Sequence, residues 1–145
     1  MALSAECIAR LAPEDVDRLF RSGEVGQIPD GVADGLAIFS PGNPFQPLLG
    51  KLARGLAWKG KVVNARRGEL RNRVSALGVH AIAAEVYPGR SWFDGAECIV
   101  LDYSKRSRVA HFVRDEIRRV APGLYLGLVY LWQTRVMYFT LKFTA

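Results

Sequence analysis

The chain has 145 residues, of which half are apolar, and it carries a formal net charge of +6. This length and apolar fraction suit one continuous core, so we expect a single domain over residues 1–145. The longest mainly apolar stretch, residues 124–132, is far shorter than the roughly 20 residues of a membrane-spanning helix, which excludes a helical membrane protein.

Residues 1–57 are predicted to form a helical N-terminal segment with one short strand. Pro13, followed by two acidic residues and by apolar residues at helical spacing, predicts an amphipathic helix that ends near Gly23. The pattern of residues 34–39 is that of a short strand. The leucines of residues 48–58 suit a second short helix, although two glycines weaken it.

The main strands are predicted within residues 58–145. Runs of apolar residues, separated by Gly, Pro, Asn or charged turns, indicate strands at 59–65, 68–76, 80–87, 97–104, 124–133 and 135–143. Several short strands at this spacing are typical of an all-β sandwich or barrel. Residues 109–120 fit either a helix or a strand, and we favour a strand that bends at Asp115 because the flanking runs are strands.

The last two strands are apolar on both faces. Leu124, Leu126 and Leu128 share one face of the first, while Val129 and Leu131 lie on the other. A strand with one face in water would alternate more cleanly between apolar and polar residues. We therefore expect both faces to be covered, either by the N-terminal helices or by the second subunit of a homodimer.

The strands that end in YLGLVYLW and RVMYFTLKF, after a helical N-terminus, resemble the calycin-type and related small barrels, which include lipocalins, fatty-acid-binding proteins, nitrobindin-like proteins and some bacterial barrel cyclases. The chain is not a lipocalin by motif, because Trp58-Lys59-Gly60 inverts the order of the lipocalin Gly-x-Trp signature. The phrases SWFDG, VRDEIR and APGLYLG are similar to those of an uncharacterised bacterial family. The resemblance implies a mainly β fold, a small antiparallel β-barrel with one or two short N-terminal helices.

Such a barrel implies an interior that binds one small hydrophobic molecule. The alternative is an interior filled by the protein's own side chains. The candidate ligand contacts are bulky aromatic residues and one methionine, namely Trp58, Trp92, Phe93, Tyr125, Tyr130, Trp132, Met137 and Phe139.

Carboxylates are the candidates for catalysis. If the strand face that Asp102 shares with Cys98 and Val100 is interior, desolvation would raise the pKa of Asp102 towards that of a general base, and Tyr103 would point the other way.

Arg114, Asp115 and Glu116 form a second charged cluster, in which Arg114 could bind a substrate anion while a carboxylate moves a proton. A structural ion-pair network is the other interpretation of this cluster.

Three functions follow from these candidates. The first is binding of a small hydrophobic molecule. The second is a cofactor-independent cyclase, isomerase or lyase that acts on a polyketide-, terpenoid- or lipid-like substrate. It would work by acid–base catalysis with Asp102 or Glu116 opening onto the pocket beside Arg114, Tyr103 or Tyr125. The third is an interaction module that uses Trp92 and Phe93 as exposed anchors.

The sequence predicts no metal and no cofactor. Cys7 and Cys98 form no metal-ligand cluster, and a haem role would require His80 or His111 to face the interior. Residues 55–61 match a P-loop in spacing but precede a strand, so we attribute the match to chance.

Partners and location follow from charge and from the N-terminus. The basic residues are scattered among acidic ones, so we expect no nucleic-acid partner and no membrane partner. The N-terminus has acidic residues where a signal peptide would be apolar, and a cytoplasmic location is therefore expected.

Overall fold

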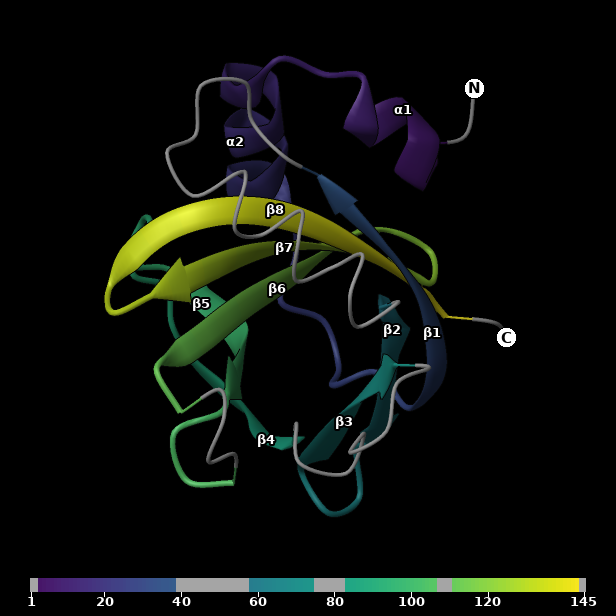
Figure 1. The fold of residues 1–145 in the computed structure, drawn as a ribbon. Coiled ribbons are helices and arrows are strands. Elements are labelled where there is room, and N and C mark those ends of the chain that lie inside the picture. Colours follow the sequence, from purple (N-terminus) through teal and green to yellow (C-terminus); the bar gives the residue numbers. More distant parts are fainter. Residues whose placement is uncertain (1–2, 39–57, 75–82, 107–110, 144–145) are drawn as a thin grey trace.

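The structure is a computed structural model that describes residues 3–38, 58–74, 83–106 and 111–143. Within these residues, two short helices precede strands that pair in chain order and close into an antiparallel barrel, because β8 pairs with β1 (Figure 1). The mainly β barrel expected from the sequence is confirmed. The elements are α1 (Ala5–Ala9), α2 (Pro13–Ser22), β1 (Gly31–Ile38), β2 (Trp58–Asn64), β3 (Glu69–Val74), β4 (Ala83–Arg90), β5 (Glu97–Asp102), β6 (Val113–Ala121), β7 (Leu124–Leu131) and β8 (Thr134–Phe143).

The helix predicted from Pro13 is α2, with that proline in its first turn and two acidic residues behind it. Helix α1 was not expected; the side chain of Ser4 caps it by accepting a hydrogen bond from the backbone N–H of Cys7. The second helix predicted at 48–58 lies outside the described residues, except that β2 already begins at Trp58. No helix in the described ranges is long and apolar enough to cross a membrane.

Apart from shifts of a few positions at the strand ends, the strands differ from the sequence prediction at Pro88 and at Asp115. Strand β4 continues through Pro88 to Arg90, where a turn was expected. Proline has no backbone N–H with which to donate a hydrogen bond. Because β3 pairs with β4 only as far as Glu85, Pro88 leaves no paired residue of β3 without its hydrogen bond. Of residues 109–120, which fitted either a helix or a strand, the part from Val113 onward forms strand β6, and residues 109 and 110 lie outside the described residues. The register of β6 with β7 runs unbroken through Asp115, and the irregularity expected there falls instead between Arg119 and Ala121.

The barrel interior is lined from alternate positions of all eight strands. The buried residues that form this core are Ala33, Val63, Leu70, Ala84, Val86, Ile99, Leu101, Tyr103, Ile117, Tyr125, Phe139, Leu141 and Phe143. These positions establish which face of each strand points inward. The residues between them along each strand therefore point outward and lie on the outer wall.

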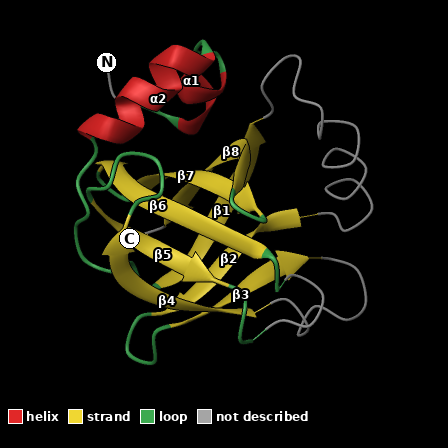
Figure 2. Ribbon diagram, turned by 90° about the vertical axis from the view of Figure 1, so that its left-hand side faces the viewer, coloured by secondary structure: helices red, strands yellow, loops and turns green. Residues whose placement is uncertain are grey.

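The outer wall of β7 and β8 is covered by the N-terminal helices. Ile8, Val16 and Phe20 are fully buried there, against the outward leucines of β7 and against Tyr138. The two views place both helices on one side of the barrel, next to β6, β7 and β8 (Figures 1 and 2). The helices thus provide the cover that the two-sided apolar pattern of these strands requires.

One end of the barrel is closed by residues 24–30, the connection from α2 to β1. Glu24 makes a two-hydrogen-bond bridge with the backbone of Arg119, at 2.9 and 2.7 Å. Val25 and Ile28 then pack against the interior core, and this segment crosses the ring of strands in the view of Figure 1. The Tyr125 hydroxyl donates a hydrogen bond of 3.2 Å to the carbonyl oxygen of Gln27 and ties the segment to β7.

Gly127 is the point where the interior leaves no room for a side chain. It lies opposite Phe139 in the β7–β8 register, and a Cβ atom at Gly127 would overlap the Phe139 ring. We expect Gly127→Ala to lower the free energy of unfolding by about 1–3 kcal/mol, because overpacking forces the ring or the backbone to shift. Denaturant unfolding would measure the loss, and the double variant with Phe139→Leu should lose less than the sum of the two. An unchanged midpoint for Gly127→Ala would contradict this packing.

Candidate functional site

The alternation of inward and outward side chains along β5 decides which of its polar residues enter the barrel. Ile99 and Leu101 belong to the interior core, and Tyr103, which directly follows the strand, is buried in the same core. Asp102 therefore lies on the outer wall. Its proposed catalytic role required an interior position, which Asp102 does not occupy.

The surroundings of Asp102 also differ from those of a general base. Tyr87 donates a hydrogen bond of 2.7 Å to its Oδ2, and the backbone N–H and hydroxyl of Ser104 donate to its Oδ1. Partial burial acts to raise the pKa of Asp102, but the hydrogen bonds outweigh it and lower the pKa. The expected rise of this pKa is therefore wrong.

Arg114 and Glu116 also lie on the outer wall, because they alternate with the inward Asp115 and Ile117. Glu116 is fully buried beneath the β4–β5 turn, where its carboxylate accepts hydrogen bonds from the Ser91 hydroxyl at 2.6 Å and from the backbone N–H of Trp92 at 2.7 Å. Arg114 donates to the same carboxylate at 3.1 and 3.2 Å. This geometry matches the structural alternative for the cluster, since it fastens the turn to the barrel wall.

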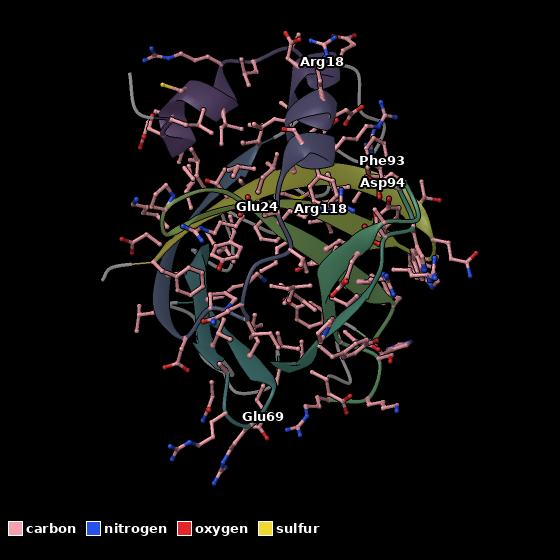
Figure 3. The ribbon with its side chains drawn as sticks, turned by 180° about the vertical axis from the view of Figure 1, so that it is seen from behind. Arg18, Glu24, Glu69, Phe93, Asp94 and Arg118 are labelled. Carbon is pink, nitrogen blue, oxygen red and sulfur yellow. The ribbon has the colours of Figure 1, made fainter. Side chains whose placement is uncertain are left out.

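Arg118 extends this outer network to the helices. It donates two hydrogen bonds to Asp94, at 2.6 and 2.8 Å, and one to the carbonyl oxygen of Phe20 at 3.2 Å. Hydrogen bonds from Arg118 hold the pKa of Asp94 at about 2. Figure 3 shows Arg118 beneath the end of α2, with Asp94 and Phe93 beside it. These contacts join α2, β6 and the β4–β5 turn into one unit.

The aromatic ligand candidates separate in the same way. Tyr125 and Phe139 face the interior. Trp92 and Tyr130 stack edge to face on the outer wall, and Phe93 packs against Phe20 of α2. Of the remaining candidates, Trp132 lies exposed in the β7–β8 turn and stacks on Phe112 at 4.3 Å, Met137 packs beside Leu131 and Val136, and the side chain of Trp58 is not among those described.

Three polar side chains enter the interior together: Lys61 from β2, Asp115 from β6, and Tyr103. Lys61 Nζ donates a hydrogen bond to Tyr103 Oη at 2.6 Å, and Tyr103 Oη donates one to Asp115 Oδ2 at 3.3 Å. Lys61 Nζ also lies 3.3 Å from the same Oδ2 in an ion pair whose side chains are only 5% and 4% exposed. We call these three residues the interior polar cluster.

The interior polar cluster is set in an apolar environment. The Lys61 ammonium lies 5.3 Å from the ring centres of both Phe139 and Tyr103. Burial raises the pKa of Asp115 and lowers the pKa of Lys61, while their mutual attraction opposes both shifts. Among the described residues, no hydrogen-bond donor reaches the second carboxylate oxygen, Asp115 Oδ1. A buried acceptor without a donor is rare in folded proteins.

Sequence reasoning missed Lys61 and placed Asp115 only within a charged triplet. The signal that could have found them is the alternation of inward and outward side chains along a strand, which repeats every two residues. Asp115 lies between Val113 and Ile117 on an otherwise apolar strand face, and Lys61 shares a face with Val63. A charge in such a face predicts a buried pair, but the partner comes from a strand 54 positions away and could not be identified from the pattern alone.

Other features of the described residues do not add to this site. A pocket of about 260 Å³ lies between the end of α2 and residues 119–122, and its lining contains no member of the interior polar cluster. No group of three or more His, Cys, Asp or Glu side chains placed to hold a metal occurs in the described part of the chain. Of the two histidines, His80 is outside the described residues, and the ring of His111 packs edge to face against Phe112.

Comparison with known proteins supports the fold and does not assign an activity. No family model and no curated protein matches the chain. A crystal structure of a protein from Thermomonospora curvata is similar in fold, with a TM-score of 0.62 and 16% sequence identity over 93% of this chain and 89% of that chain. At this identity the similarity establishes the barrel architecture alone.

Proposed function

We propose that the protein binds one small, mostly apolar molecule inside the barrel, with the polar part of that molecule at the interior polar cluster. The observation that carries this proposal is Asp115 Oδ1, which accepts no hydrogen bond from any described residue although its side chain is only 4% exposed. A buried polar atom without a partner carries a desolvation penalty of about 1–3 kcal/mol, which a ligand group would remove.

The architecture supports the same conclusion. A closed eight-stranded barrel is of the size that encloses side chains or one small ligand. Residues 24–30 close one end, whereas Tyr103 and Asp115 lie towards the opposite end, where β5 ends and β6 begins. The interior residues around them are predominantly apolar, which suits a hydrophobic ligand with one polar group.

Nile red, a neutral apolar dye whose fluorescence rises in apolar surroundings, would test this function. We expect saturable binding of one dye per chain. Ala84→Phe adds bulk inside the barrel, where Ala84 is fully buried, and should weaken dye binding at least about tenfold, a loss of 1.4 kcal/mol.

The matched control is Val32→Phe, which introduces the same ring on the outer wall at a position that is 46% exposed. It should leave dye binding unchanged, and thermal unfolding would verify that both variants fold. Equal dye binding by the two variants would show that the dye lies outside the barrel and would contradict the proposal.

The interior polar cluster also favours a second candidate function, acid–base catalysis on the bound molecule by a cofactor-independent cyclase, isomerase or lyase. The specific observation is that burial brings the pKa values of Asp115 and Lys61 towards each other, with the Tyr103 hydroxyl between them. Asp102 and Glu116 do not take part in this version, because both lie on the outer wall. Turnover of a candidate substrate should fall by about 10²–10⁴ in Asp115→Asn and remain unchanged in Asp102→Asn.

A further inference from the structure

The hydrogen bonds of the interior polar cluster are asymmetric at Asp115. Both Lys61 Nζ and Tyr103 Oη approach Oδ2, each at 3.3 Å. In the described part of the structure, Oδ1 receives no donor, although the whole side chain is buried. A ligand group that satisfies this oxygen must therefore bring its own O–H or N–H, because a carboxylate oxygen accepts and does not donate.

The charges of the cluster restrict the ligand further. The Lys61 ammonium and the Asp115 carboxylate balance each other inside the barrel, so the pair needs no counter-ion. A second carboxylate next to Oδ1 would place two negative charges together in an apolar interior, which strongly disfavours the doubly ionised state. An ester or ether would place an acceptor against an acceptor and leave Oδ1 unsatisfied.

We propose that the bound molecule is a neutral hydrogen-bond donor, an apolar chain or ring that carries a hydroxyl or N–H group, and not a fatty-acid anion. This inference rests on the proposed binding function and specifies its ligand class. The donor group of the ligand bonds to Asp115 Oδ1, while the apolar part contacts the aromatic and aliphatic residues of the interior core, such as Phe139 and Leu101.

Displacement of Nile red by three probes of equal chain length would test the ligand class. The probes are 1-decanol, decanoate and methyl decanoate, compared at neutral pH below their critical concentrations for aggregation. We expect decanol to bind at least tenfold more tightly than either of the others, because it alone satisfies Oδ1 without adding a charge.

Asp115→Asn tests the role of the residue. It is nearly isosteric and removes the negative charge, which leaves Lys61 as the net charge of the cluster. The ratio of decanol affinity to decanoate affinity should then fall at least tenfold. Asp102→Asn is the matched control, since it makes the same change on the outer wall and should leave this ratio at its wild-type value.

The outcomes distinguish the two proposals. The absence of saturable dye binding, or equal dye binding by Ala84→Phe and Val32→Phe, would overturn the proposed binding of small apolar molecules, and the ligand class with it. Saturable dye binding that decanol does not displace would overturn the ligand class alone. Displacement in which decanoate or methyl decanoate equals or exceeds decanol would preserve binding and overturn the ligand class. The wild-type comparison is sufficient for that decision even if Asp115→Asn does not fold; a folded variant with an unchanged ratio would overturn the role of Asp115.

Discussion

Arg118→Met is expected to lower the free energy of unfolding by about 2–4 kcal/mol, because it removes the buried guanidinium of an ion pair with the partly exposed Asp94, together with its hydrogen bonds to two backbone carbonyl oxygens. Arg118 is 1% exposed, and its guanidinium donates to Asp94 and to the carbonyl oxygens of Phe20 and Glu97. Its guanidinium also lies 4.5 Å from the centre of the Phe20 ring. Methionine fills the space but leaves all three acceptors without this donor.

The chain provides a matched control for Arg118. Arg18 pairs with Asp15 at 2.7 Å, within hydrogen-bond distance like the Arg118 pair, but its side chain is 76% exposed. It points away from the barrel (Figure 3). Arg18→Met should change stability by less than about 1 kcal/mol, because exposed ion pairs contribute little. Denaturant unfolding of the two variants measures the difference, and equal losses would show that burial does not govern the strength of these pairs.

The second large effect is expected inside the barrel. Lys61→Met leaves the Asp115 carboxylate buried without its counter-ion, and we expect a loss of about 3–5 kcal/mol at pH 7. Replacing both members, as Lys61→Met with Asp115→Leu, removes the unpaired charge together with the desolvation penalty. The double variant should therefore regain most of that stability or exceed the wild type by about 1–4 kcal/mol.

This comparison bears directly on function. If the double variant is as stable as the wild type and no longer binds ligand, the interior polar cluster is retained for binding and not for stability. Urea unfolding at pH 7 gives the stabilities, and Nile red displacement by decanol gives the binding. A double variant that loses the sum of the two single losses would contradict the expectation and make the cluster a structural element.

Much of the strand content could be predicted because it depends on local pattern. Alternating apolar residues separated by Gly and Pro turns placed most of the strands within a few positions of their observed ends. The proline with acidic residues behind it located α2 for a similarly local reason. Pro88 shows the limit of local rules, since a residue that normally ends a strand is accommodated where β3 does not reach.

The candidate site could be predicted only in part. The sequence marks Tyr103 and Asp115 as candidates, but it favours Asp102 and Glu116 over Asp115 as the catalytic acids. A strand pattern shows which residues share a face and does not show which face closes inward when both faces are apolar or charged. On β5 and β6 that choice exchanges Asp102 for Tyr103 and Glu116 for Asp115.

A mainly β domain with a helical start, and with terminal strands that must be covered on both faces, can be predicted from residue order without the structure. These properties follow from residue type and spacing along neighbouring positions. The tertiary structure alone decided that the helices provide the cover, and that Lys61, Tyr103 and Asp115 meet inside the barrel. The reason is that barrel closure fixes the inward face of every strand at once, and it brings together residues from strands that are far apart in the chain.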